Sequence, residues 1–167
     1  MKCLCFSDSH GYSDGMIAAI RKNPDADVVF FLGDGLSDAE DAARSSLVRC
    51  AWLTVRGNCD YRNFFLDNTC VLKTDEITLL GKKIVFTHGD LYNVKSSTYG
   101  LLELAEQRCA DAVLFGHTHV AYHDITSVAS RTVFLFNPGS VSPRSYPQTY
   151  GVIEITEKDI SFSYHKI

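Results

Sequence analysis

The 167-residue sequence has no apolar stretch that approaches the ~20 residues needed to span a bilayer. Its amino-terminal apolar run, residues 1–6, is too short for the core of a signal peptide and leads directly into polar residues. It also lacks an excess of basic residues, because the formal net charge is −4 and the pI is about 5.8. These absences predict a cytoplasmic protein that neither enters a membrane nor binds long nucleic acids.

The six cysteines lack the paired spacing of zinc-binding motifs. Cys3 and Cys5 are one residue apart, which places both on one face of a strand. Several cysteines lie in apolar runs, as reduced core cysteines do, so we expect no disulfide framework. The sequence shows no repeat, linker or low-complexity segment, and its length suits one domain spanning residues 1–167.

The first third of the chain alternates apolar runs with helical patterns. A continuous apolar run, typical of a strand buried on both faces, occupies residues 28–32, and strands are also expected at 2–7 and 51–55. Helices are expected at 14–21 and 39–47. This order, strand–helix–strand–helix–strand, predicts parallel strands in an α/β fold.

The remainder is richer in strands, with one clear helix at 97–109 and an apolar strand at 112–115. Residues 64–66 are expected to form a loop or one helical turn. Further short strands are expected at 69–73, 76–80, 83–87, 120–125, 132–136, 150–155 and 160–164. A hairpin turn is expected at 81–82 and a turn-rich loop at 137–144.

Polar residues of metal-binding type follow the apolar strands. In open parallel sheets, ligands bind outside the carboxyl ends of the strands, so these side chains are expected to gather at one edge. The candidate metal ligands are Asp8, His10, Asp34, Asn58, His88, His117 and His119.

Nitrogen and oxygen ligands together suit a transition metal better than Ca²⁺ or Mg²⁺. Two cations bridged by one carboxylate can clamp the oxygens of a phosphoryl displacement, and Asp34 is the natural bridge. The glycines next to the candidate ligands would permit tight turns and close backbone approach; they are Gly33, Gly57, Gly89 and Gly116.

This ordered set resembles the calcineurin-like metallophosphoesterase family. Five motifs carry the resemblance: Asp8-Ser9-His10, Gly33-Asp34, Gly57-Asn58-Cys59-Asp60, His88 and Gly116-His117-Thr118-His119. The short chain and the Asn137-Pro138-Gly139-Ser140 loop resemble the small phosphodiesterase branch of that family, which includes the YfcE-type enzymes and the retromer subunit Vps29.

The resemblance implies a four-layer αββα sandwich of two mixed β-sheets flanked by helices. It implies two divalent transition-metal ions, with Mn as the first choice and Fe, Ni, Zn or Co as alternatives. One ion would be held by Asp8, His10, Asp34 and His119, and the other by Asp34, Asn58, His88 and His117. A metal-activated hydroxide would hydrolyse a phosphodiester, with Asp34, Asn58 and His117 as catalytic residues.

The family histidine after the asparagine is Cys59 here. In relatives that histidine helps to protonate the leaving group, and a thiol is a poor substitute for it. We therefore expect a preference for substrates with good leaving groups, such as aryl esters.

The expected partner is a small phosphodiester, with a homo-oligomer left open. The alternative function is a protein-interaction scaffold of the Vps29 type with little or no catalysis.

Neighbouring polar residues receive structural roles. Asp60 is expected to support the Asn58 turn or a ligand by hydrogen bonding rather than to bind metal. Ser9 and Thr118 are expected to be spacers between ligands. The remaining polar candidates are expected to be solvated, packing, cap or loop residues: Arg144, His123, His165, Asp14 and Asp90.

Overall fold

The computed structural model describes residues 1–45, 49–66 and 69–167. Its first half builds most of a five-stranded sheet with the order β12-β11-β1-β2-β3, in which β1, β2 and β3 are parallel. Two helices connect these parallel strands, as the alternating sequence pattern predicts. The elements are β1 (Lys2–Phe6), α1 (Asp14–Lys22), β2 (Val28–Phe31), α2 (Leu36–Ser45) and β3 (Ala51–Thr54).

A second five-stranded sheet has the order β6-β7-β8-β10-β9, with β8 parallel to both β7 and β10. A short 3-10 helix, η1, and helix α3 connect β7 to β8. The elements are β6 (Thr74–Leu79), β7 (Lys82–Thr87), η1 (Asp90–Tyr92), α3 (Tyr99–Arg108), β8 (Ala112–Leu114), β9 (Ala121–Val128) and β10 (Arg131–Pro138).

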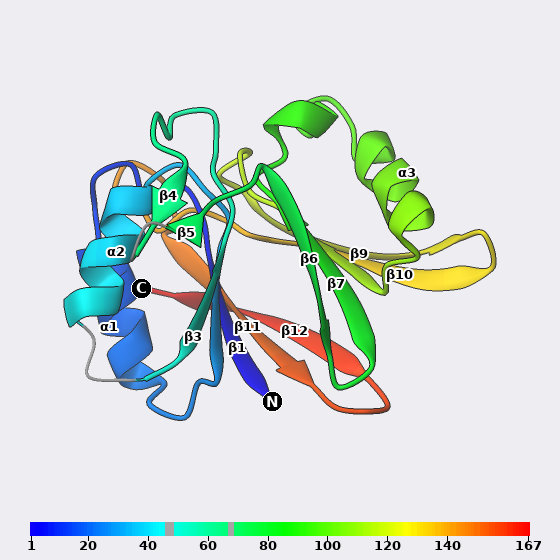
Figure 1. The fold of residues 1–167 in the computed structure, drawn as a ribbon, viewed down its shortest axis with the longest axis horizontal. Helices are drawn as coiled ribbons and strands as arrows, with labels where there is room; N and C mark the ends of the chain where they lie inside the picture. The colour runs from blue at the N-terminus through cyan, green and yellow to red at the C-terminus, as the bar shows by residue number, and fades with distance from the viewer. Residues whose placement is uncertain (46–48, 67–68) are drawn as a thin grey trace.

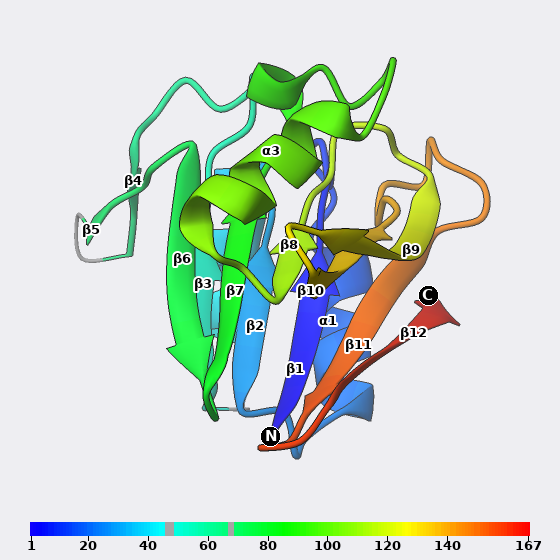
Figure 2. The same cartoon turned by 90° about the vertical axis from the view of Figure 1, so that its right-hand side faces the viewer.

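The carboxyl-terminal strands return to the first sheet. Strand β11 (Thr149–Ile155) pairs antiparallel with β1, and β12 (Ile160–Lys166) forms the adjoining edge. Figures 1 and 2 show the two sheets face to face, with α1 and α2 against the first sheet and α3 against the second. The predicted αββα sandwich of two mixed sheets is therefore confirmed.

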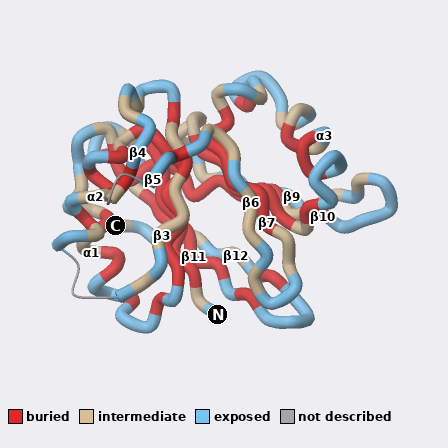
Figure 3. Tube along the Cα trace, viewed as in Figure 1, coloured by how far each residue is buried: buried red, intermediate tan, exposed pale blue. Residues whose placement is uncertain are grey.

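Three hydrophobic clusters fill the spaces between these layers. The cluster between the sheets contains Cys3, Cys5, Phe30 and Phe86, and the last two rings lie 5.3 Å apart edge to face. The intervening residues of β1, Leu4 and Phe6, belong instead to the cluster under α1 and α2. Side chains therefore alternate between two buried layers along β1, which explains its continuous apolar sequence. Figure 3 shows that the buried residues of the chain concentrate along the strands of the two sheets.

The structure corrects several predicted boundaries. Phe64–Phe65 forms a short strand, β4, which pairs with β5 (Thr69–Cys70), so the loop or helical turn predicted at 64–66 is wrong. The hairpin turn falls at Leu80–Gly81 rather than at 81–82, with φ angles of 49° and 80° that match the twist of paired strands. Residues 46–47 of the predicted second helix lie outside the described residues.

Two further predicted segments are shifted. Asn137 and Pro138 belong to β10, so the predicted loop begins only at Gly139. The helix predicted at 97–109 spans 99–108. Within the described part of the chain, no helix has both the length and the apolar character needed to cross a membrane.

Candidate metal centre

One group of candidate ligands combines the ends of β1 and β8. Oxygen or nitrogen atoms of Asp8, His10 and His119 all lie within 4.8 Å of one another. The Nε2 atoms of His10 and His119 are 3.2 Å apart, and Oδ1 of Asp8 is 3.2 Å from Nε2 of His119. This group brings together residues that are more than 100 positions apart in the sequence because β1 and β8 end at the same side of the two sheets.

A second group combines the ends of β2, β7 and β8. Ligand atoms of Asp34, His88 and His117 lie within 4.8 Å of one another. His88 Nε2 is 3.1 Å from His117 Nδ1 and 3.4 Å from Asp34 Oδ2. The two histidines of the Gly116-His117-Thr118-His119 motif thus fall into different groups.

The two carboxylates connect the groups. Oδ2 of Asp34 lies 3.8 Å from His10 Nε2 in the first group, and Oδ1 of Asp8 lies 4.0 Å from His88 Nε2 in the second. Asp34 therefore occupies the position that a bridging ligand requires. The grouping is observed, whereas metal binding by the individual residues stays a prediction.

The side chains fit a pair of metal ions. Oδ1 of Asp8 is fully buried and accepts no well-aligned hydrogen bond from the described residues, although His119 Nε2 lies 3.2 Å away. A buried carboxylate oxygen without a hydrogen bond is costly. Nδ1 of His88 donates to the Leu32 carbonyl oxygen at 2.8 Å, which leaves the lone pair of Nε2 directed at the second group. This is how protein groups orient a metal-binding histidine.

The surroundings of Asp34 keep its side chain ionised. Burial alone would raise the pKa of Asp34, but the His88 ring and the Cys59 N–H hold that pKa well below its usual range. Asp34 is therefore a carboxylate over the whole physiological range.

The histidines respond to both burial and charge. The Asp8 carboxylate raises the pKa of His119. Burial lowers the pKa of His117, and the charges of His88, when it is protonated, and of Lys95 add to this effect. A metal binds the neutral form of an imidazole. The surroundings of His117 favour that neutral form, whereas the Asp8 carboxylate favours the protonated form of His119.

The backbone at the site is unusual. Five of the seven candidate ligands have positive φ angles between 48° and 68°, namely Asp8, His10, Asp34, His117 and His119. Left-handed backbone is uncommon for residues other than glycine, and its clustering is typical of functional sites.

Glycine is required at two neighbouring positions. Gly33 has a φ of 96°, and a Cβ placed there would lie 2.4 Å from the Gly57 nitrogen. A Cβ on Gly57 would lie 2.0 Å from Oδ1 of Asp34. The loops after β2 and β3 can therefore lie this close to one another, with the Asp34 carboxylate between them, only if both positions are glycine.

Asp60 supports the site as predicted. Its Oδ1 accepts hydrogen bonds from the backbone N–H groups of Gly35 and Leu36, both at 2.9 Å. Its Oδ2 accepts from the N–H groups of Asp34 and Gly57, both at 2.8 Å. One carboxylate therefore joins the loop that carries Asp34 to the loop that carries Asn58.

Ser9 and Thr118 are not mere spacers, and that prediction is wrong. Ser9 is buried, and its hydroxyl donates to Asp38 Oδ2 at 2.6 Å. The hydroxyl of Thr118 accepts from the Asn137 amide at 3.0 Å. Both contacts hold a ligand-bearing loop against a distant segment of the chain.

Asn58, the one amide among the predicted ligands, follows β3 in the turn that also carries Cys59. Its side chain is exposed, and its amide nitrogen lies 3.2 Å from the Cys59 sulfur. Cys59 itself lies near the first group, because its sulfur is within 4.8 Å of ligand atoms of His10 and Asp34. Burial, followed by Asp34, raises the pKa of the Cys59 thiol to about 11, so the thiol is neutral at pH 7.

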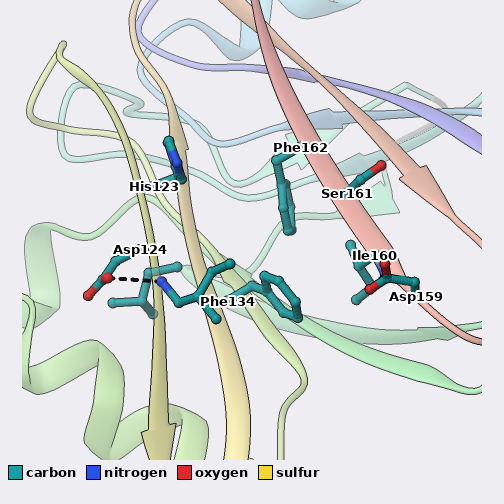
Figure 4. Close-up of a pocket in the computed structure, with 9 residues that line it drawn as sticks. His123, Asp124, Phe134, Asp159, Ile160, Ser161 and Phe162 are labelled. Atoms are coloured by element: carbon teal, nitrogen blue, oxygen red, sulfur yellow. Dashed lines mark hydrogen bonds between the residues drawn. The ribbon is translucent and has the colours of Figure 1, made fainter.

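The remaining polar candidates lie outside the two groups. The Arg144 guanidinium lies 5.8 Å from the Tyr12 ring centre, and Asp90 accepts from the Lys73 ammonium at 2.7 Å. His123 packs against Tyr164 on the outer strands and lines a separate pocket of about 370 Å³ between β9, β10 and β12. Figure 4 shows Phe134 and Phe162 among the residues that line this pocket, with their ring centres 5.6 Å apart; none of the candidate ligands lines it.

Comparison with known proteins agrees with this geometry. The model of the calcineurin-like phosphoesterase superfamily domain matches residues 1–158. A Bacillus subtilis protein named "Probable metallophosphoesterase YsnB" is 30% identical over 142 residues, which cover 84% of this chain and 75% of the relative.

Two solved structures show the same fold. Vps29 from Entamoeba histolytica complexed with Zn²⁺ has a TM-score of 0.72 at 19% identity and covers 100% of this chain and 98% of its own. An archaeal phosphodiesterase has a TM-score of 0.71 at 19% identity and covers 99% of this chain and 100% of its own.

Proposed function

Because the chain belongs to the calcineurin-like phosphoesterase superfamily, we propose that it is a phosphodiesterase that uses two divalent metal ions. The observation that carries the proposal is the pair of buried carboxylates, Asp8 and Asp34, each of which lies within 4.0 Å of histidines in both groups. The activity of the archaeal phosphodiesterase with this fold makes diesters the first substrates to test.

The residues divide into two ligand sets. Asp8, His10, Asp34 and His119 would hold one ion, and Asp34, Asn58, His88 and His117 would hold the other. Mixed imidazole and carboxylate donors favour a transition metal, with Mn²⁺ as our first choice. When bound, two such ions supply an activated water and neutralise charge on the phosphoryl oxygens.

The chain itself contributes orientation and charge. His88 is fixed by the Leu32 carbonyl, and the His117 backbone N–H donates to Asp8 Oδ2 at 3.0 Å. Asp34 stays ionised and receives the Cys59 N–H at 2.8 Å. These contacts preorganise the ligands and thereby lower the cost of assembling the site.

Substrate class is tested by a panel of p-nitrophenyl esters under Mn²⁺, Zn²⁺, Ni²⁺ and Co²⁺. We expect bis(p-nitrophenyl) phosphate to be hydrolysed at least about tenfold faster than p-nitrophenyl phosphate, and EDTA to abolish both rates. Bound metal without hydrolysis of any ester would instead favour the protein-interaction scaffold.

Replacing Cys59 by histidine should raise turnover of diesters with poor leaving groups. Cys59 lies beside the first ligand group and is a neutral thiol, whereas an imidazolium there could protonate a departing alkoxide. We expect a gain of about tenfold or more in kcat/KM for an alkyl diester and a smaller gain for an aryl diester. Cys70→His, at another exposed cysteine, is the matched control, and equal gains on both substrates would refute this role.

A further inference from the structure

A second pocket, of about 240 Å³, shares the loop after β8 with the candidate metal centre. Its lining includes Phe115, Thr118, Val120 and Tyr122 from the β8–β9 segment. Thr118 stands between the ligands His117 and His119 in the sequence. The same loop therefore forms part of the pocket wall and presents two candidate metal ligands.

The β8–β9 wall of the pocket is apolar and partly aromatic. The rings of Phe115 and Tyr122 lie 6.0 Å apart in an edge-to-face arrangement. Val120 is 64% exposed, so its side chain is accessible to a ligand in the pocket. A cavity of about 150 Å³ accommodates benzene, so this pocket has room for one substituted ring.

The opposite wall supplies a cation and hydroxyl groups. Lys95 and Ser97 line the pocket. A phosphate ester that binds at the metal centre and places one ester substituent in this pocket would lie near the positive charge of Lys95.

We propose that this pocket binds the ester arm that stays on phosphorus, and that this arm carries a planar aromatic ring such as an aryl group or a nucleobase. The proposal rests on the phosphodiesterase function proposed above. In an in-line displacement the leaving oxygen departs opposite the attacking oxygen, so the leaving arm points away from the ligands. A pocket beside the ligands is therefore suited to the retained arm.

Binding tests the pocket without relying on turnover. The probes are phenylphosphonate and methylphosphonate, titrated into the Mn²⁺-loaded protein by calorimetry. We expect the wild type to bind phenylphosphonate about tenfold more tightly than methylphosphonate. Val120→Asn should weaken phenylphosphonate binding by about fivefold to tenfold and leave methylphosphonate binding unchanged.

Ile125→Asn is the matched control, because Ile125 is a β-branched residue that is 61% exposed and lies outside the pocket. It should change neither affinity. Equal binding of the two phosphonates by the wild type would overturn the proposal. So would a loss of phenylphosphonate binding in Tyr61→Asn but not in Val120→Asn, since Tyr61 lines a different pocket beside Cys59.

Kinetics then identify which arm occupies the pocket. Phenyl p-nitrophenyl phosphate and methyl p-nitrophenyl phosphate share one leaving group and differ only in the retained arm. Val120→Asn should raise KM for the phenyl ester alone, and an equal rise for both esters would place the leaving arm there and overturn the assignment. If no diester is hydrolysed, the phosphodiesterase function fails, while a phosphonate preference that depends on Val120 would still support an aromatic-arm pocket.

Discussion

Replacing Asp34 by asparagine should lower kcat/KM for bis(p-nitrophenyl) phosphate by about 10³-fold or more. Oδ2 of Asp34 lies between His10 and His88, and its Oδ1 accepts the Cys59 N–H. An asparagine that keeps the Cys59 hydrogen bond must turn its NH₂ group toward the two imidazoles. It would then offer a donor, not a lone pair, at the position shared by both ligand sets.

The fold should survive this substitution, because the two side chains have the same shape. Circular dichroism and thermal unfolding of the variant are the necessary checks. Asp124→Asn makes the same chemical change on exposed strand β9, where the carboxylate accepts the N–H of the neighbouring Ile125, and should retain wild-type activity. A folded Asp34→Asn protein with activity within tenfold of the wild type would exclude Asp34 as the shared ligand.

Replacing Asp60 by asparagine should impair both stability and metal affinity. The Asp60 carboxylate accepts four backbone N–H groups, from Asp34, Gly35, Leu36 and Gly57. An amide can offer only one oxygen to these donors, and its NH₂ group would face two N–H groups directly. Charge-assisted hydrogen bonds of this kind are among the stronger ones in proteins.

We expect a loss of about 2–4 kcal/mol in the free energy of unfolding, measured with urea in EDTA. Mn²⁺ affinity should fall by about 10- to 100-fold, as is typical when a group that orients metal ligands is removed. Asp124→Asn serves again as the control for the chemical change. Unaltered metal affinity in a destabilised variant would show that Asp60 holds the fold together without positioning the ligands.

The order of strands and helices could be predicted because the buried strands are continuous apolar runs in the sequence. Val28–Phe31 and Ala112–Leu114 are continuous apolar segments since both faces of these strands are buried. The polar residues that follow these strands meet where the strands end, and six of the seven candidate ligands fall into two groups whose ligand atoms lie within 4.8 Å of one another. Asn58, the seventh, lies on an exposed turn beside Cys59, whose sulfur is within 4.8 Å of ligand atoms of His10 and Asp34.

The features that sequence reasoning missed depend on contacts between distant residues. Nothing local distinguishes Ser9 from a spacer, because its partner Asp38 is 29 residues away. The left-handed backbone of the ligand residues is equally hidden, since glycine rather than aspartate or histidine normally marks such positions. The β4–β5 pair was missed because two-residue strands have no periodicity to detect.

The most direct test of the account is a titration of the metal-free protein with Mn²⁺, in which bound metal and diester hydrolysis are measured on the same samples. The account predicts that two ions bind per chain and that hydrolysis of bis(p-nitrophenyl) phosphate develops only as the second ion binds. Full activity with one ion or with none, or two bound ions with no hydrolysis of any diester, would contradict it.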